Sequence, residues 1–268
     1  MKLARLMTDS GDVVYASRSA DGTLRRVTGD PYAGDLKATD DVVEAKAWLP
    51  PIEPKELVCI GLNYRKHAEE GGAPIPEYPV VFMKNLSAAI GHGAPIRVPA
   101  VCEDEVDYEA ELAIVIGKTC RNATKENAKD YVLGYTAAND VSARVWQSKK
   151  GGTQWVRGKS FDTFAPLGPV LVTSDEIGDP NALAIRSELN GQQMQSSNTR
   201  DMIFDVPTLI SFLSQDTTLL PGTVILTGTP EGIGWARNPK ILLEPGSTIT
   251  IEIEGIGKLT NPVEVAEE

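Results

Sequence analysis

The sequence predicts a β-rich α+β fold with helices at its periphery. Segments rich in Val, Ile and Tyr outnumber segments with helical periodicity, and the connections between them are short. At 268 residues the chain can bury a substantial core, as one large domain or as two unequal ones. Its hydrophobic content of 41% and charged content of 24% are ordinary for a globular protein.

The N-terminal region predicts short strands joined by turns. Leu3–Met7 and Val13–Ala16 flank a turn at residues 10–12, and no potential catalytic groups cluster in this region. Three prolines in the segment 48–54 favour an extended backbone. We therefore expect a small N-terminal β domain and linker at 1–54, followed by a larger domain at 55–268.

The sequence of the larger domain predicts strands that alternate with a few short helices. The expected strands are 56–60, 79–84, 106–116, 132–139, 183–189, 192–196, 223–227, 249–254 and 258–263. Asn190-Gly191 is a strong hairpin signal between two of them. The expected helices are 63–70, 124–131 with Thr124 as its cap, a turn that begins at Asp140, and the amphipathic segment 205–213.

The strand 106–116 has an unusual distribution of charge. Side chains alternate between the two faces of a strand, so Asp107, Glu109 and Glu111 share a face that continues as Ala113 and Val115. One interpretation is the mouth of a pocket, where crowded carboxylates repel one another and a divalent cation relieves the repulsion. The other is an exposed edge strand whose acids deter aggregation. The strand alone supports both equally.

A carboxylate from another strand can join Glu109 and Glu111 to form a metal site. Glu109 and Glu111 are two residues apart on one face, and Asp140 ends another predicted strand. Oxygen ligands without His or Cys favour Mg²⁺, Mn²⁺ or Ca²⁺ over zinc. Three carboxylates suit Mg²⁺, which keeps some of its water. The alternative is that Asp140 only caps the helical turn that follows it.

His67 and Glu70 lie three residues apart on a predicted helix and therefore face the same way. A carboxylate that orients an imidazole makes a general base near neutral pH. The alternative is a solvated histidine on a surface helix. The only other histidine, His92, has no acidic neighbour in sequence, and we interpret it as structural.

Several polar groups can bind carboxylate or carbonyl oxygens, although each taken alone is more often a surface residue. Lys84 ends an apolar strand, Arg144 and Gln147 share a helical face, and Lys159 follows a glycine. The glycine-rich segment 227–234 can let the backbone approach a ligand closely.

Charge and cysteine content limit the partners and the compartment. The net charge of −11 argues against non-specific nucleic-acid binding and against attraction to anionic membranes. Three cysteines without C-x-x-C spacing favour a reducing compartment. We find no apolar run of about 20 residues and no signal-peptide pattern, so we expect a cytoplasmic protein.

Several of these stretches, taken together and in this order, resemble the fumarylacetoacetate hydrolase family over roughly residues 57–264. The matching motifs are Gly61-Leu62-Asn63-Tyr64 with His67 and Glu70, Pro79–Lys84, Glu109-Ala110-Glu111, Asn139–Arg144, Gly158–Phe164 and Leu226–Pro230. The segments 154–159 and 195–199 look closest to the subgroup called domain-containing protein 2, with which oxaloacetate tautomerase activity is associated.

The resemblance implies a mixed β-sandwich roll, a homodimer and a Mg²⁺ or Mn²⁺ site, which Ca²⁺ can occupy in crystals. It implies that the metal ligands are Glu109, Glu111 and Asp140, and that the segment with His67 forms a lid. The implied substrate-binding residues are Tyr64, Lys84, Arg144, Gln147 and Thr229. Many relatives have an acid where this chain has Val145, so the sequence leaves open what orients Arg144.

The family resemblance also implies chemistry on small 2-keto acids. We expect hydrolytic C–C cleavage of an acylpyruvate-type substrate through a metal-bound enolate. In that reaction His67, polarised by Glu70, activates water, and Lys159 stabilises negative charge on the substrate. The alternatives are oxaloacetate tautomerisation or decarboxylation and hydroxymuconate-type isomerisation. A more distant alternative is a non-catalytic module that binds a dicarboxylate.

Overall fold

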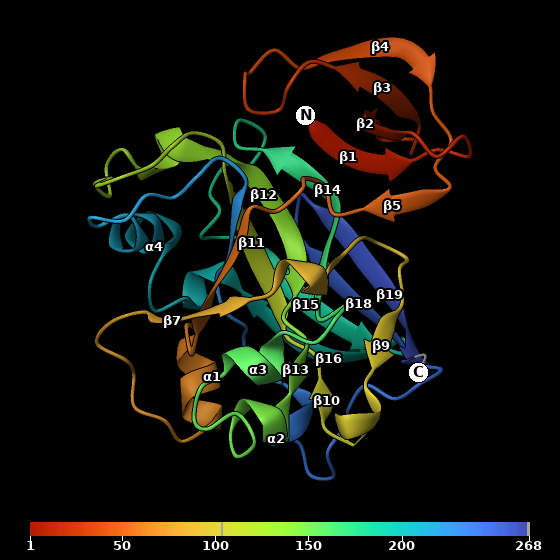
Figure 1. The fold of residues 1–268 in the computed structure, drawn as a ribbon. Coiled ribbons are helices and arrows are strands. Elements are labelled where there is room, and N and C mark those ends of the chain that lie inside the picture. The colour runs from red at the N-terminus through yellow and green to blue at the C-terminus, as the bar shows by residue number, and fades with distance from the viewer. Residues whose placement is uncertain (103, 267–268) are drawn as a thin grey trace.

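Two β-sheets packed face to face form the body of the protein (Figure 1). The computed structural model describes residues 1–102 and 104–266. The larger sheet is mixed, and its strand order is β4 (Lys37–Val42), β3 (Leu24–Thr28), β2 (Val13–Arg18), β1 (Lys2–Met7), β14 (Ala165–Thr173), β12 (Val132–Asn139), β11 (Ala110–Ile116), β17 (Thr223–Leu226), β6 (Glu56–Gly61) and β7 (Val80–Lys84). Two short strands join it at the side, β5 (Ala47–Leu49) beside β1 and β8 (Ala89–Ile90) beside β14.

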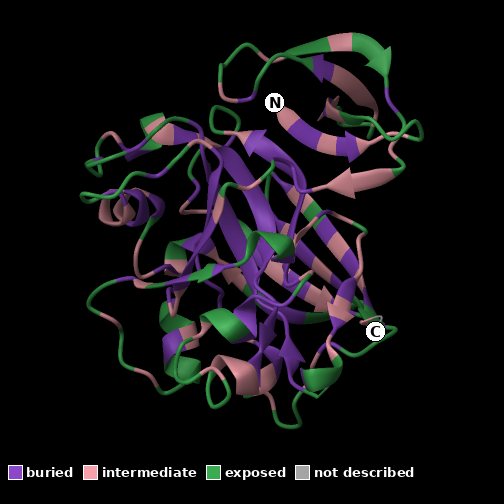
Figure 2. Cartoon of the chain, in the orientation of Figure 1, coloured by how far each residue is buried: buried purple, intermediate pink, exposed green. Residues whose placement is uncertain are grey.

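The smaller sheet covers the centre of the larger one. Its strand order is β16 (Gln192–Asn198), β15 (Ala184–Leu189), β18 (Thr248–Ile253), β19 (Gly257–Val265) and β9 (Ile96–Val98). Buried and more exposed residues alternate along β18, as expected for a sheet with one face on the core and one toward solvent. β11, β12 and β14 lie against this sheet and are buried almost throughout (Figure 2). The prediction of a β-rich sandwich roll is confirmed.

The N-terminal strands continue the larger sheet. β1 pairs with β14 in the register Leu3↔Leu171, and β5 pairs with β1 in the register Leu6↔Trp48. The expected linker at 48–54 therefore starts inside a strand. Figure 1 shows β1 to β5 gathered at one end of the molecule. The division at residue 54 stays a prediction.

The helices are few and lie outside the sheets. They are α1 (Arg65–Glu70), α2 (Arg144–Gln147), α3 (Val156–Lys159) and α4 (Val206–Leu213), together with the 3₁₀ turns η1 (Leu86–Ala88), η2 (Ala100–Cys102), η3 (Ala128–Tyr131), η4 (Thr199–Asp201) and η5 (Gly234–Ala236). α4 begins where we predicted, because the Asp205 carboxylate accepts a hydrogen bond from the Thr208 amide.

The helix predicted at 124–131 is wrong. Only the 3₁₀ turn η3 forms, and Thr124 does not cap it. The Asn127 side chain accepts the Thr124 amide hydrogen at 2.9 Å. Such local side-chain bonds compete with the first turn of a helix.

The strand predicted at 106–116 is divided in two. β10 (Val106–Asp107) pairs separately with β13 (Ser142–Ala143), while β11 starts at Ala110 and lies between β12 and β17. Every residue of β11 is buried. The exposed edge-strand interpretation is therefore wrong, and the acids of this segment are interior groups.

Candidate active site

A cavity of about 280 Å³ lies where β6, α1, α2 and α3 meet the start of β11. Figure 1 shows α1, α2 and α3 gathered at this end of the sheets. Six of the predicted site residues line the cavity: His67, Glu109, Arg144, Gln147, Lys159 and Thr229. The rest of its wall is mainly apolar, with Phe82 and Trp155 in edge-to-face contact.

Glu109, Glu111 and Asp140 converge at the base of this site. One carboxylate oxygen from each lies within 4.8 Å of the others, and all three residues are buried. The pairing of β11 with β12 brings them together, because Ala110 lies opposite Asn139 and the Asp140 amide donates to the Glu109 carbonyl. Asp140 is not a helix cap, because α2 begins four residues later after β13.

Two lysines hold this carboxylate cluster. The Lys159 ammonium donates to Glu109 Oε2 and to Asp140 Oδ2, at 2.7 Å each. Lys84 Nζ donates to Asp140 Oδ1 at 2.5 Å and to the Val141 carbonyl at 3.0 Å. Lys84 is not part of the cavity wall, so the structure places its amine on Asp140. Its predicted contact with substrate stays a prediction.

The two glutamates have opposite electrostatic environments. Burial opposes ionisation of Glu109, but Lys159 and Arg144 lower its pKa well below the ordinary value. Burial and the charges of Asp140 and Glu109 raise the pKa of Glu111 well above the ordinary value. Among the described residues no lysine or arginine forms an ion pair with Glu111. Its one hydrogen bond within the described chain is accepted from the Gly228 amide, at 2.7 Å.

The donor set fits a hard divalent cation. All three side chains offer carboxylate oxygens, which Mg²⁺ and Mn²⁺ prefer. Glu111 is a buried acid that makes no ion pair with a described lysine or arginine, and a cation held by the triad would supply a direct counter-charge. We therefore take Glu109, Glu111 and Asp140 as the residues that could hold a metal.

Arg144 is oriented by Asp107, which the sequence had left without a role. Arg144 Nε and Nη2 both donate to Asp107 Oδ2, at 2.9 and 2.7 Å, and Nη1 donates to Glu109 Oε1 at 2.6 Å. Asp107 also accepts the backbone amides of Gly234 and Trp235. An acid at position 145 is therefore not needed to orient this arginine.

His67 and Glu70 form the predicted pair on α1. His67 Nδ1 lies 3.1 Å from Glu70 Oε2, and Glu70 Oε1 accepts the Gly232 amide at 2.9 Å. Partial burial raises the pKa of Glu70, but its bonds with His67 and Gly232 lower it more, so the net pKa lies below the ordinary value. Because the carboxylate can only accept, Nδ1 carries the hydrogen, and in the neutral imidazole the lone pair is therefore on Nε2.

Of two further residues predicted to bind substrate, Gln147 lies in the cavity wall and Tyr64 lies outside it. Gln147 lines the cavity and accepts a hydrogen bond from Arg144 Nη1 at 3.1 Å. Tyr64 is fully buried outside the cavity wall, and its hydroxyl has no hydrogen-bond partner among the described residues. Substrate contact by Tyr64 stays a prediction. His92, which we interpreted as structural, accepts the Thr260 amide outside the site.

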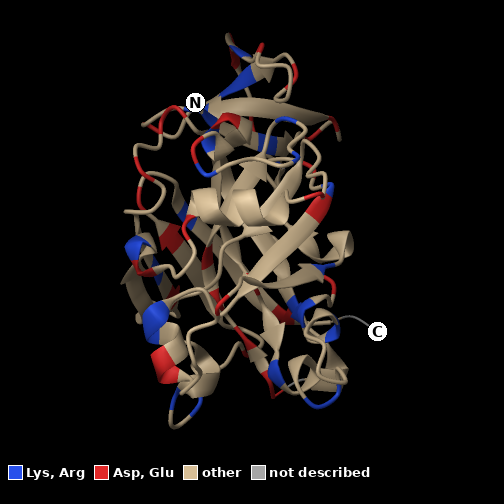
Figure 3. Ribbon diagram, turned by 90° about the vertical axis from the view of Figure 1, so that its left-hand side faces the viewer, with Lys and Arg blue, Asp and Glu red and all other residues tan. Residues whose placement is uncertain are grey.

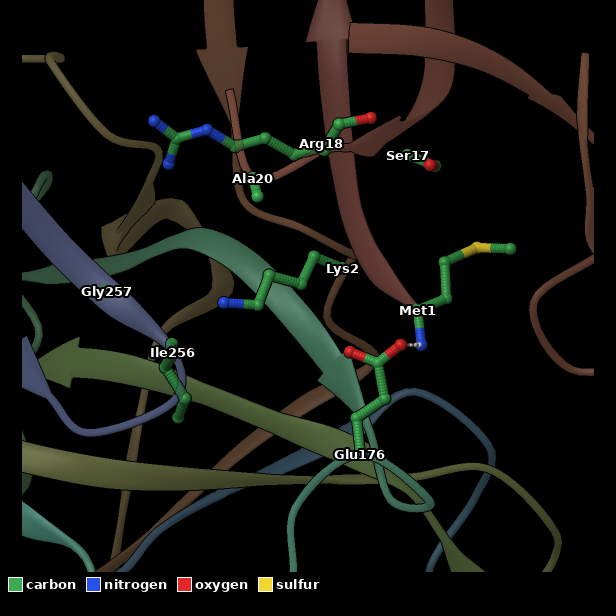
Figure 4. Close-up of a pocket in the computed structure, with 9 residues that line it drawn as sticks. Met1, Lys2, Ser17, Arg18, Ala20, Glu176, Ile256 and Gly257 are labelled. Atoms are coloured by element: carbon green, nitrogen blue, oxygen red, sulfur yellow. Dashed lines mark ion pairs between the residues drawn. The ribbon is translucent and has the colours of Figure 1, made fainter. Parts of the chain in front are cut away.

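A larger cavity, of about 460 Å³, lies between the N-terminal strands and the roll (Figure 4). The Met1 amino group pairs there with Glu176, while the side chains of Lys2 and Arg18 both extend away from this pair (Figure 4). The described residues of its wall include no histidine and no second acid, so we do not place the chemistry there.

Acidic and basic residues are interspersed over the face in Figure 3 and do not gather in one basic patch. Within the part of the chain that the structure describes, no helix combines the length and apolar character needed to cross a membrane.

The fold and the site together define a class of protein: a β-sandwich roll with a small cavity above a buried carboxylate triad. The family model described as fumarylacetoacetate (FAA) hydrolase C-terminal matches residues 56–264. The chain belongs to the fumarylacetoacetate hydrolase family.

Relatives from several organisms agree with this assignment. The chain is 50% identical over 216 residues to a Xenopus laevis protein named oxaloacetate tautomerase fahd2, mitochondrial, with 80% of this chain and 67% of that protein covered. An uncharacterized protein of Archaeoglobus fulgidus is 50% identical over 252 residues, covering 94% and 92% of the two chains. A solved structure of a 2-hydroxyhepta-2,4-diene-1,7-dioate isomerase from Mycobacterium marinum is 40% identical, with a TM-score of 0.84 and complete coverage of both chains.

Proposed function

We propose that the protein is a divalent-metal-dependent enzyme that interconverts the keto and enol forms of a small 2-keto dicarboxylic acid such as oxaloacetate. One observation carries the proposal: a single small cavity brings His67, Lys159 and Arg144 together above the carboxylate triad. The names of the relatives support a tautomerase or isomerase. They therefore favour what the sequence offered as an alternative over C–C hydrolysis, our first expectation.

The cavity has the size for a small anion. About 280 Å³ is at the low end for ligand pockets. Arg144 and Lys159 line it, but both pair with carboxylates, so a cation held by the triad would supply the positive charge that an anion needs. Arg144 is held by Asp107 and Glu109, so its guanidinium is oriented before a substrate arrives. We infer that Arg144, Gln147 and Thr229 bind a substrate carboxylate.

Glu109, Glu111 and Asp140 would hold the cation. When bound there, it would act as a Lewis acid toward the 2-keto acid and so make the C3 protons more acidic. Lys84 and Lys159 hold the ligand carboxylates in place.

His67 would carry the proton in this reaction. In the keto-to-enol direction, Nε2 takes a proton from C3, the C–H electrons form the C2–C3 double bond, and the electrons of the C2–O double bond move to oxygen. Lys159 donates a hydrogen bond to that oxygen, which takes the proton back from the His67 imidazolium to complete the enol. One proton leaves carbon and one joins oxygen, so the substrate and product are isomers. Glu70 stabilises the imidazolium while it holds the proton.

The test follows the ultraviolet absorbance of enol-oxaloacetate with purified protein and Mg²⁺ or Mn²⁺, in parallel with an acylpyruvate hydrolysis assay. We expect the approach to keto–enol equilibrium to be accelerated. His67→Ala should remove the acceleration and keep the rise in melting temperature on adding Mg²⁺, whereas Glu111→Gln should lose both. His92→Asn is the matched control, because an amide oxygen can still accept the Thr260 amide.

Two results would contradict the proposal. If no keto acid is turned over with either metal, the protein is not this enzyme, and a non-catalytic dicarboxylate-binding role becomes the better interpretation. If acylpyruvate is hydrolysed and enol-oxaloacetate is untouched, the same residues serve hydrolysis instead.

A further inference from the structure

We propose that Gln195 is a positioning residue that fixes the Thr229 hydroxyl as a hydrogen-bond donor into the cavity. Thr229 would then recognise an acceptor-only oxygen of the substrate, such as a carboxylate oxygen. This inference rests on the proposed function, because it adds a specificity determinant to the same site. The segment 195–199 contributes to the family resemblance, but it does not predict that Gln195 is buried, because a glutamine in a hairpin strand is usually exposed.

The amide of Gln195 can have only one orientation. Its Oε1 accepts the Ala110 backbone amide at 3.0 Å, and its Nε2 donates to the Pro230 carbonyl at 2.9 Å. An N–H group can only donate and a carbonyl oxygen can only accept, so these two partners identify the oxygen and the nitrogen. The side chain is completely buried, so water does not compete for these bonds.

This orientation decides what the Thr229 hydroxyl does. Gln195 Nε2 donates to Thr229 Oγ1 at 2.8 Å, so the threonine oxygen acts as the acceptor. Its own hydrogen must therefore point elsewhere. Among the described residues this hydroxyl has no other partner, and Thr229 lines the cavity. The hydroxyl hydrogen is thus available to a ligand.

Gln195 also connects two segments of the site. Ala110 lies between Glu109 and Glu111 on the chain, and Thr229 and Pro230 belong to the loop that follows β17. Ser187 fixes the glutamine from behind, because its hydroxyl donates to Gln195 Oε1 at 3.0 Å and accepts the Gln195 amide hydrogen at 3.2 Å. All hydrogen-bonding atoms of the side chain are thereby used, so the amide cannot rotate without losing several bonds.

The decisive variant is Gln195→Glu. It keeps the size of the side chain and the oxygen that Ala110 and Ser187 need. The amide nitrogen, which donates two hydrogens, becomes an oxygen that has none as a carboxylate and one as a carboxylic acid. Any such hydrogen goes to the Pro230 carbonyl, which can only accept. The Thr229 hydroxyl should then turn its hydrogen toward residue 195 and present lone pairs to the cavity. We expect KM for oxaloacetate to rise about tenfold or more, the scale for a lost bond to a charged group, while kcat changes by less than about threefold.

A double-variant cycle separates positioning from a general structural role. Thr229→Val should raise KM by a similar factor, and Gln195→Met should cost nothing further in the Thr229→Val background. Thr229→Ser keeps the hydroxyl and the Gln195 contact, so it should raise KM by a clearly smaller factor than Thr229→Val. Independent KM effects in the cycle, or a wild-type KM in a folded Gln195→Glu protein, would overturn the proposal. Equal KM values for Thr229→Ser and Thr229→Val would also overturn the proposal, even if the Gln195 variants do not fold.

Calorimetric binding of oxalate in the presence of Mg²⁺ keeps this test separate from the proposed function. Weaker oxalate binding by Gln195→Glu and Thr229→Val in a protein that turns over no keto acid would support the positioning role and refute the tautomerase. Unchanged oxalate binding together with normal turnover would refute the positioning role alone.

Discussion

At the scale of single residues, the site depends on ion pairs between residues far apart in sequence. Asp107 is an example: it lies near the predicted ligands, but its carboxylate holds Arg144 and two backbone amides of the 234–235 segment. The alternation of side chains along one strand predicted that Asp107 shares a face with Glu109. The break between β10 and β11 separates the role of Asp107 from that of Glu109 and Glu111. Which acid binds an arginine and which faces a metal depends on such local breaks.

Glu70 should control how the proposed activity depends on pH. Its folded-state pKa is lowered, so its carboxylate is charged throughout the neutral range, and its contribution is lost only as pH falls through that lowered value. We expect Glu70→Gln to reduce kcat by about tenfold or more, because the imidazolium loses its counter-charge. Measured pH–rate profiles should show the largest ratio of wild-type to variant kcat at neutral pH, and this ratio should fall as pH drops through the lowered pKa of Glu70.

Glu69→Gln provides the matched control. Glu69 precedes Glu70 on the same helix and is exposed. Both substitutions replace a glutamate by a glutamine, so they change the net charge equally. The pH–rate profile of Glu69→Gln should match that of the wild type. Equal losses in the two variants would mean that surface charge, not the His67 contact, explains the effect.

At the scale of elements, local signals worked where a side chain bonds to its own helix or turn. Asp205 starts α4, and Asn190-Gly191 forms the hairpin turn with both residues at positive φ. The same reasoning failed for the helix predicted to begin at Thr124, because the Asn127 side chain accepts a hydrogen bond from the Thr124 amide. Propensity alone does not decide between these competing local bonds.

The cap of α4 gives a stability prediction. Asp205→Ala removes the acceptor of the Thr208 amide and should lower the free energy of unfolding by about 1 kcal/mol. Asp205→Ser, which keeps a capping oxygen, should recover most of that loss. Urea denaturation of the three proteins is the measurement, and identical midpoints would show that this cap does not contribute.

At the scale of the whole molecule, the continuous larger sheet connects the N-terminal strands to the roll. β1 pairs with β14, and β14 also pairs with β12 next to the ligand strand. The predicted domain boundary at residue 54 therefore lies between segments that share hydrogen bonds. We expect the two parts to unfold together.

Leu6→Ala tests this cooperativity. Leu6 is fully buried, and its loss should cost about 2–5 kcal/mol and lower the melting temperature while the transition stays single. Val13→Ala, at a half-exposed position paired with Met7 in the same region, should have a much smaller effect. A separate early transition in calorimetry would instead indicate an independent N-terminal domain.

The sequence by itself determined the β-rich class, the hairpin, the start of α4 and a short set of candidate groups, because these follow from local bonding and from the chemistry of carboxylates two residues apart. Tertiary structure alone decided how those groups are paired. Lys84 meets Asp140 across 56 positions, Arg144 meets Asp107 across 37, and Gln195 reaches Ala110 across 85. These contacts arise from strand pairing and loop packing between distant segments, and no local pattern carries that information.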